Sequence, residues 1–186
     1  MIRQTLDFAA EGFAPMTNSE QMIRRLPSRS ASLLQICGCN VEVIAPLTAR
    51  ILGAPCQGSS PTHGPRAYSI GPTEWLLIDY AIGDVRQTVR READRALLRI
   101  TDVSDAYVSL RVEGPAAQSV LLSDIGAPST VITAQPGQYA RVRLAQAEVV
   151  MQCIARDIFE LLVDRSLAAY LEGWLAAQSR NFRSAL

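Results

Sequence analysis

The sequence contains no lysine, and all 18 of its basic residues are arginine. The absence of lysine excludes a P-loop lysine, a Schiff-base lysine and a lysine general base. Histidine is nearly absent as well, because His63 is the only one, so these residues cannot supply a metal site with several histidine ligands. A chain this poor in catalytic side chains is typical of a component of an enzyme rather than of a complete enzyme.

Neither sign of charge is in excess, because the 186 residues include 18 basic and 18 acidic ones. A nucleic-acid-binding domain calls for a basic face, so this balance argues against a nucleic-acid partner. Near-neutrality also leaves little self-repulsion, which permits stable association with another subunit.

Long apolar runs are missing too. No stretch approaches the roughly 20 residues that span a membrane, and the N-terminus carries Asp7 and Glu11 in place of the apolar core of a signal peptide. The cysteines follow no spacing of a secreted disulfide framework. We therefore expect a cytoplasmic protein without membrane contact. The four cysteines are Cys37, Cys39, Cys56 and Cys153.

The first 30 residues differ from the rest and predict an N-terminal arm. They mix glycine, proline and polar residues, and only Asn18–Leu26 has a helical pattern. The arm is either a disordered tail or an extension that wraps a partner. Docking of such an arm requires apolar anchors, for which the candidates are Leu6, Phe8, Phe13, Met22 and Leu26.

From residue 31 on, the periodicity predicts the order strand–helix–strand–strand–helix twice, with one extra strand in the second copy. The first half predicts a strand over Ser32–Cys37, a helix over Val41–Leu52, a hairpin of Arg66–Ile70 and Glu74–Asp79, and a helix over Asp84–Leu98. The second half predicts a strand over Tyr107–Glu113, a helix over Ala116–Ile125, strands over Tyr139–Ala145, Glu148–Ala155 and Ile158–Val163, and a helix from Ser166.

This order predicts an α+β fold with a pseudo-duplicated, mainly antiparallel sheet and helices on one face. We expect one domain over residues 31–186, built from two βαββα-like halves of about 31–99 and 100–186. The last helix places Leu167, Tyr170, Leu171, Trp174 and Leu175 at helical spacing, which predicts a buried stripe. Trp75, Tyr170 and Trp174 are therefore expected to serve structural roles in the core.

Few residues suggest chemistry. Cys37 and Cys39 could join Cys56 and His63 in a zinc site, but their spacing fits no common zinc motif, and we expect two buried thiols and an exposed histidine. Asp102 and Asp105 could form an acid–base pair, although Thr101–Asp105 is more typical of a turn between strands. The sequence thus predicts no catalytic, cofactor-binding or metal site on this chain.

Several motifs resemble the gamma subunit of heterotetrameric sarcosine oxidase. The resemblance runs from about Ser32 to Ala177. It rests on Gly71-Pro72 followed by Glu74-Trp75-Leu76-Leu77, on Thr101-Asp102-Val103-Ser104-Asp105, and on Arg165-Ser166 with Tyr170 and Trp174-Leu175. That family is similar in fold to the folate-binding domain of the glycine-cleavage aminomethyltransferase, an α+β fold.

The resemblance implies a non-catalytic accessory subunit that docks on the large alpha subunit, in a complex with beta and delta subunits. FAD, FMN, NAD and tetrahydrofolate would belong to the partner subunits, and the complex would oxidatively demethylate sarcosine. After the third helix the family usually shows Pro-Leu-Asp-Leu, where this chain has Ala127-Pro128-Ser129-Thr130. The substrate is therefore either sarcosine or another N-methylated amine.

A free-standing folate-binding or aminomethyl-transfer module is the alternative. Such a module needs a carboxylate for the pterin ring and an aromatic wall for stacking, and the candidates are Asp102 and Tyr107.

Overall fold

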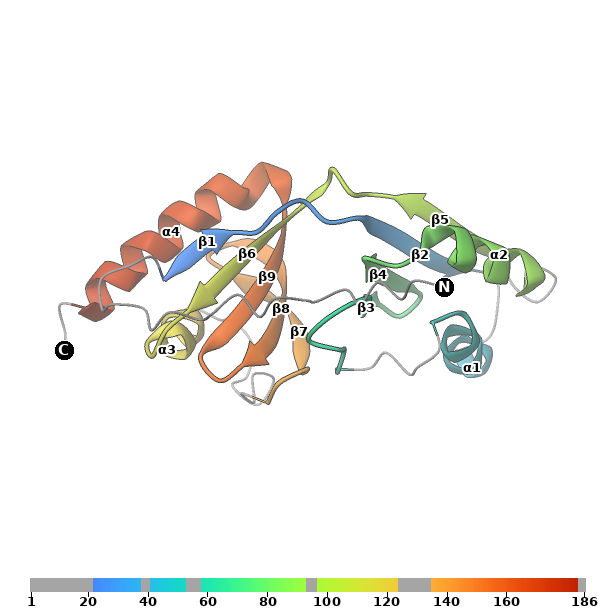
Figure 1. Cartoon of the computed structure of the whole chain (residues 1–186), viewed down its shortest axis with the longest axis horizontal. Helices are drawn as coiled ribbons and strands as arrows, with labels where there is room; N and C mark the ends of the chain where they lie inside the picture. Colours follow the sequence, from blue (N-terminus) through green and yellow to red (C-terminus); the bar gives the residue numbers. More distant parts are fainter. Residues whose placement is uncertain (1–21, 38–40, 53–57, 93–96, 124–134, 184–186) are drawn as a thin grey trace, which may run out of the picture.

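The computed structural model describes residues 22–37, 41–52, 58–92, 97–123 and 135–183 (Figure 1). These residues form nine strands and four helices. In chain order they are β1 (Ile23–Arg25), β2 (Ala31–Cys37), α1 (Val41–Leu52), β3 (Arg66–Gly71), β4 (Glu74–Ile78), α2 (Ile82–Glu92), β5 (Leu97–Asp102), β6 (Tyr107–Glu113), α3 (Ala117–Leu122), β7 (Tyr139–Leu144), β8 (Ala147–Ala155), β9 (Ile158–Asp164) and α4 (Arg165–Arg183).

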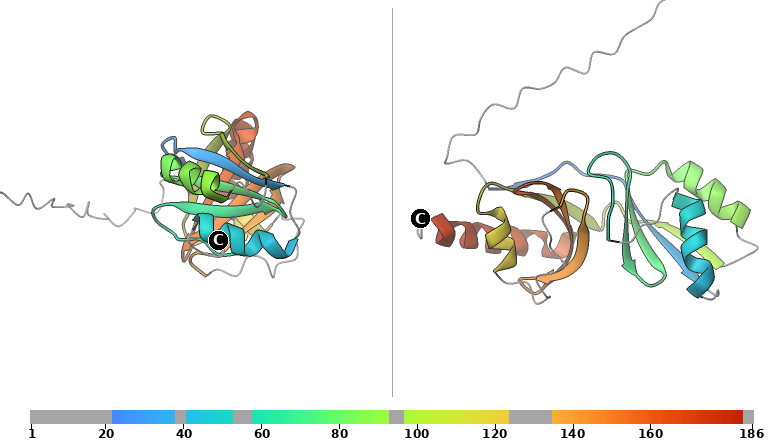
Figure 2. Two further views of the ribbon diagram at one scale, coloured as in Figure 1. Left: turned by 90° about the vertical axis from the view of Figure 1, so that its right-hand side faces the viewer. Right: turned by 90° about the horizontal axis from the view of Figure 1, so that it is seen from below.

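The strands form two antiparallel sheets rather than the single sheet expected. The four-stranded sheet has the order β3-β4-β2-β5, and the five-stranded sheet has the order β1-β6-β9-β8-β7. Buried side chains of α1 and α2 pack on one face of the four-stranded sheet, and those of α3 and α4 pack on one face of the five-stranded sheet. The opposite faces of the two sheets meet in a third apolar cluster (Figure 2). The α+β class is confirmed.

The duplication predicted from the order of elements is visible in the strand pairing. In the first half β2 pairs with β4 and β4 with β3, and in the second half β6 pairs with β9 and β9 with β8. Leu34 at the centre of β2 and Leu110 at the centre of β6 are both fully buried. The extra strand of the second half is β7, at the edge of its sheet.

In front of each half lies a strand that pairs in the sheet of the other half. β1 pairs with β6, and β5 pairs with β2 (Figure 1). The prediction of a helix over Asn18–Leu26 is wrong for the residues that the structure describes. The backbone nitrogen of Glu113 donates to the carbonyl of Met22, and that of Leu26 donates to the carbonyl of Ser109, so this segment is extended. Met22 and β1 therefore belong to the fold of the five-stranded sheet, residues 26–30 connect β1 to β2, and β5 spans the expected boundary between the halves.

Helix bounds were predicted with mixed success. The bounds of α1 agree with the expectation, and Val85 and Val89 place the buried face of α2. However, α2 ends at Glu92, and Leu97 opens β5 with 72% of its surface exposed. None of the described helices is long and apolar enough to cross a membrane.

The apolar stripe of α4 is offset from the expected one. The helix buries Ala168, Leu171 and Leu175, while Leu167 and Tyr170 are 38% and 50% exposed. Trp174 is partly buried against the same core. Tyr170 therefore lies beside the buried stripe, contrary to its expected place in the core. Helical spacing gave the period of the stripe correctly, but several apolar residues next to it left its direction ambiguous.

Candidate functional site

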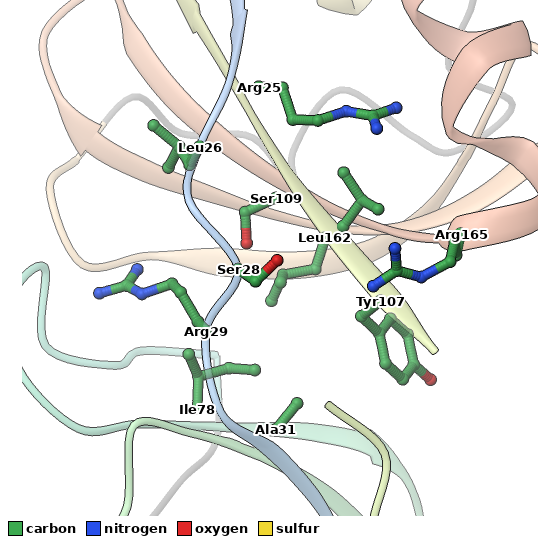
Figure 3. Close-up of a pocket in the computed structure, with 11 residues that line it drawn as sticks. Arg25, Leu26, Ser28, Arg29, Ala31, Ile78, Tyr107, Ser109, Leu162 and Arg165 are labelled. Atoms are coloured by element: carbon green, nitrogen blue, oxygen red, sulfur yellow. The ribbon is translucent and has the colours of Figure 1, made fainter. Parts of the chain in front are cut away.

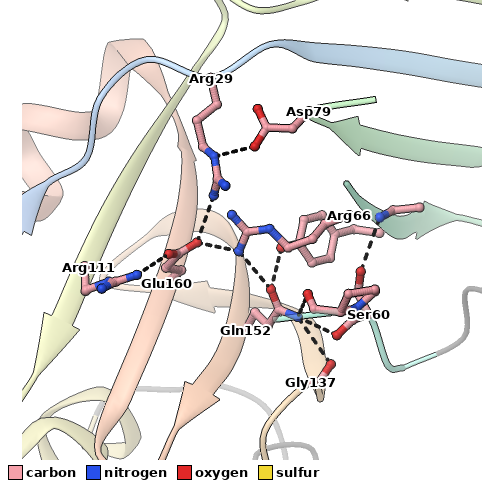
Figure 4. A network of polar contacts seen from close by, with 11 residues as sticks. Arg29, Ser60, Arg66, Asp79, Arg111, Gly137, Gln152 and Glu160 are labelled. Carbon is pink, nitrogen blue, oxygen red and sulfur yellow. Dashed lines mark hydrogen bonds and ion pairs between the residues drawn. The ribbon is translucent and has the colours of Figure 1, made fainter. Parts of the chain in front are cut away.

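The most strongly polar feature of the interior is a network of arginines and carboxylates between the two sheets (Figure 4). Its centre is Glu160 of β9, which is 6% exposed. Arg66 of β3 donates to its Oε2 over 2.5 Å and Arg111 of β6 to its Oε1 over 2.8 Å. Arg29, in the connector between β1 and β2, donates to Oε2 over 3.4 Å. One carboxylate thus ties together both sheets and the connector.

Gln152 of β8 extends the network toward the loops. Its Oε1 accepts from Arg66 over 3.1 Å and from the hydroxyl of Tyr68 over 2.6 Å. Its Nε2 donates to the carbonyl of Ser60 over 2.8 Å and lies near that of Gly137 (Figure 4). The amide of β8 therefore bonds two side chains of β3 and carbonyls of the neighbouring loops, so that these buried polar groups have partners.

Two titratable groups of the network have pKa values above their ordinary ones. Burial raises the pKa of the Tyr68 phenol well above its usual value, so the hydroxyl remains a donor. Burial also raises the pKa of Asp79, against the opposing charge of Arg66. Asp79 accepts from Arg29 Nε over 2.8 Å. Tyr139 of β7 packs edge-on against Tyr68, with ring centroids 4.9 Å apart.

The network around Glu160 holds the two sheets in contact and is poorly suited to catalysis. Glu160 is engaged by three guanidinium groups, which leaves little of its carboxylate for a substrate. Nε of Arg66 and Nε of Arg111 are buried without a partner among the described residues. Sequence analysis missed this network. The available signal was a polar residue inside each buried strand, Glu160 within β9 and Gln152 within β8.

A small pocket lies nearby, where the connector between β1 and β2 crosses β6 and the start of α4 (Figure 3). Its volume is about 50 Å³. Three arginines and three hydroxyl groups line it around an apolar floor, and none of its lining residues is acidic. The polar lining residues are Arg25, Arg29, Arg165, Ser28, Ser109 and Tyr107, and the apolar ones include Ala31, Ile78 and Leu162.

The segment Thr101–Asp105 holds the end of β5 and the turn that follows it, as one of the two interpretations predicted. Asp102 Oδ1 accepts from the backbone nitrogen of Ser104 over 3.0 Å and from its hydroxyl over 2.7 Å. These hydrogen bonds lower the pKa of Asp102. Asp105 is fully exposed and lies 3.7 Å from Arg165. Asp102 caps the turn and Asp105 faces Arg165, so the two carboxylates are not assembled as an acid–base pair.

The folate hypothesis pairs Asp102 with Tyr107, and the structure does not bring them into one pocket. Tyr107 lines the small pocket, and burial raises the pKa of its phenol. Asp102 is exposed and does not line that pocket.

The cysteines and the histidine are only partly described. His63 is exposed, as expected. Cys37 is exposed at the end of β2, so the expectation of a buried thiol is wrong there, because the side chain lies where the strand leaves the sheet. Cys153 is buried, which raises the pKa of its thiol. Cys39 and Cys56 lie outside the described residues, and no three of the described His, Cys, Asp and Glu side chains gather as a metal site would require.

The proposed docking anchors and structural aromatics fall in different environments. Met22 is a buried core residue, and Leu26 is partly buried at the small pocket. Trp75 of β4 is buried between its sheet and the helices α1 and α2. Leu6, Phe8 and Phe13 lie outside the described residues.

No protein family model and no curated protein matches this sequence. Among solved structures, heterotetrameric sarcosine oxidase from Corynebacterium sp. U-96, in complex with pyrrole 2-carboxylate, is similar with a TM-score of 0.68 and 19% identity, over 86% of this chain and 84% of that chain. Glycine cleavage system aminomethyltransferase T from Bartonella henselae is similar with a TM-score of 0.57 and 14% identity, over 85% of this chain and 46% of that chain. These similarities establish that the chain has the α+β fold shared by a sarcosine oxidase chain and an aminomethyltransferase.

Proposed function

We propose that this chain is a non-catalytic accessory subunit, corresponding to gamma, of a heterotetrameric oxidase of the sarcosine oxidase type. The observation that carries this proposal is the extent of the fold match. It covers 84% of the sarcosine oxidase chain at a TM-score of 0.68, against 46% of the aminomethyltransferase chain at 0.57. The match to the oxidase thus corresponds to nearly a whole chain of a multi-subunit enzyme.

The chemistry of the described residues supports an accessory role. The most buried carboxylate, Glu160, is bound by Arg29, Arg66 and Arg111. The small pocket, at about 50 Å³, is far below the roughly 300–1,000 Å³ typical of cofactor and ligand sites. The proposal therefore assigns FAD, FMN, NAD and tetrahydrofolate to partner subunits, with alpha as the direct partner and beta and delta in the same complex.

The alternative of a free-standing folate-binding or aminomethyl-transfer module is less well supported. A pterin ring is too large for the pocket that Tyr107 lines, and Asp102 is occupied by the turn at Ser104. The substrate of the complex is sarcosine or another N-methylated amine.

Co-expression with candidate large and flavin-binding subunits from the same host tests the proposal. The purified sample would be analysed by size-exclusion chromatography with light scattering, by its flavin spectrum, and by peroxide formation from sarcosine and other N-methyl amines. We expect the chain in a stoichiometric, flavin-containing complex, whereas the chain alone is colourless and inert. Elution of the chain apart from these subunits would contradict the proposal. Saturable tetrahydrofolate binding by the chain alone would instead favour the alternative.

A further inference from the structure

We propose that the small pocket between the β1–β2 connector, β6 and α4 is a binding site for a carboxylate group. The site would take a small aliphatic carboxylate ion or the side-chain carboxylate of a partner subunit, which share one chemistry. Its first test uses this chain alone, so it stands independently of the accessory role.

The charge of the pocket favours an anion. Arg25 and Arg165 border it, each with about half of its side chain exposed, and no acidic residue lines it. Figure 3 shows the guanidinium group of Arg165 directed into the pocket beside Tyr107, with Arg25 along the same side. Glu172 binds only Nε of Arg25, over 2.8 Å, which leaves the terminal NH₂ groups of Arg25 without a partner among the described residues.

Asp105 holds the side chain of Arg165 in place. Its Nε donates to the carbonyl of Asp105 over 2.5 Å, and its Nη2 lies 3.7 Å from the Asp105 carboxylate. The guanidinium is thereby oriented while a terminal NH₂ group remains able to donate. Orientation matters because a guanidinium that is already positioned loses less freedom when it binds an oxyanion.

Hydroxyl groups complete the polar part of the pocket. Ser109 of β6 is 7% exposed, yet its hydroxyl makes no hydrogen bond with any described residue. The hydroxyl is open to the pocket rather than enclosed, so it is available to donate to an oxyanion bound there. Ser28 lies beside Ser109 in the same space, and the ring of Tyr107 borders it with its hydroxyl directed away (Figure 3).

The size and the floor of the pocket select a small aliphatic acid over a simple inorganic anion. Ala31, Ile78 and Leu162 form an apolar floor that would accept an alkyl group. A volume of about 50 Å³ corresponds to roughly four water-sized positions, which suits a carboxylate with a short alkyl chain such as propionate. Phosphate would place oxygens against the apolar floor.

Titration of the ¹⁵N-labelled chain with propionate, followed by NMR, tests the site directly. We expect saturable shifts at Ser28, Ser109 and Arg165, and none with propionamide, which has the same shape without the charge. Arg25→Gln and Arg165→Gln should each weaken propionate binding by about 10-fold, because each removes a charge-assisted hydrogen bond. Ser109→Ala should weaken it by a smaller factor.

Arg24→Gln is the matched control. Arg24 adjoins Arg25 on β1 with a similarly exposed side chain but does not line the pocket. The Arg24→Gln substitution should leave propionate binding unchanged. Equal weakening by Arg24→Gln and Arg165→Gln would show non-specific charge attraction and overturn the site. Tighter binding of inorganic phosphate than of propionate would overturn the assignment to a carboxylate.

A second arm identifies the source of the carboxylate. If a partner side chain occupies the pocket, Arg165→Gln will reduce recovery of the complex, and propionate will compete with assembly. If a free acid occupies it, the assembled complex will still bind propionate, and Arg165→Gln will assemble at full yield. Absence of propionate binding together with full assembly of Arg165→Gln would refute the proposal for a free acid and for a partner side chain alike.

Discussion

Arg66 of β3 and Glu160 of β9 form an ion pair across the interface between the two sheets, with 2.5 Å between Nη1 and Oε2. Both side chains are almost completely buried. At the matching cross-strand positions, Arg111 lies opposite Glu160 in the five-stranded sheet, and Gln35 lies opposite Glu74 in the four-stranded sheet. The duplicated halves therefore share one polar pair, which is an ion pair around the buried Glu160 in one half and a half-buried hydrogen bond from an amide to a carboxylate in the other.

Replacement of Glu160 by glutamine should destabilise the protein strongly. The substitution leaves the buried Arg66 and the partly buried Arg111 without their counter-charge, and breaking a buried ion pair from one side typically costs about 3–5 kcal/mol. Glu74→Gln is the matched control, because Glu74 is only half-buried and accepts from a neutral amide over 2.9 Å. It should cost less than about 1 kcal/mol. Urea unfolding of both variants gives the comparison, and equal losses would mean that the network contributes no charge-specific stability.

Tyr68 should make the protein lose stability at alkaline pH. Burial raises the pKa of its phenol in the folded state, whereas an unfolded tyrosine ionises near pH 10. Above about pH 10 the unfolded state therefore binds fewer protons than the folded state, and the free energy of unfolding falls as pH rises. The contribution is fully present below that pH.

Tyr68→Phe isolates this effect. It removes the hydrogen bond to Gln152, which should cost about 0.5–1.5 kcal/mol at neutral pH. It should also flatten the decline in stability above pH 10 relative to the parent chain. Chemical denaturation at pH 7 and at alkaline pH measures both quantities. Parallel curves for the two proteins would show that the Tyr68 phenol ionises in the folded state as readily as in the unfolded chain.

The hydrophobic pattern of each segment predicted the strands and helices better than it predicted which strands pair with one another. Alternating burial and turn residues identified β3, β4 and β6 to β9, since each strand has its own periodicity. The pairing of β1 with β6 joins residues far apart in the sequence, and three residues carry too little periodicity to compete with a helical pattern. The split into two sheets depends on which faces meet, and that is decided by the packing of Tyr68, Tyr139 and Leu162 between them.

The candidate site shows the same division. The turn at Thr101–Asp105 was predictable because Asp102 and Ser104 bind each other within three residues. The network around Glu160 was not, because Arg66 lies 94 positions away in the sequence. A polar residue inside an apolar strand indicates a buried partner but does not say which one.

The two faces of α4 should respond differently to truncation. Leu171 is fully buried, so Leu171→Ala should cost about 2–5 kcal/mol. Tyr170 is half-exposed beside it, and Tyr170→Ala should change stability by no more than about 0.5 kcal/mol. Trp174→Ala should fall between them, because this side chain is only partly buried. Thermal unfolding of the three variants ranks them, and a larger loss at Tyr170 than at Leu171 would show that the helix is rotated from its described position.

The N-terminal segment should divide at Met22 into a part that the fold requires and a part that it does not. Deletion of residues 1–26 removes β1, the buried Met22 and the backbone partners of Glu113 and Ser109. Relative to a chain that lacks only residues 1–21, it should lose at least about 2 kcal/mol, the lower end of the cost of truncating a buried methionine. Met22→Ala in the full chain separates the loss of core packing from the loss of strand pairing. Equal stability of the two deletions would mean that β1 adds nothing to the sheet. The deletion of residues 1–21 is therefore the variant with which to test docking by Leu6, Phe8 and Phe13, because reduced recovery of the complex could then be assigned to the arm and not to a damaged fold.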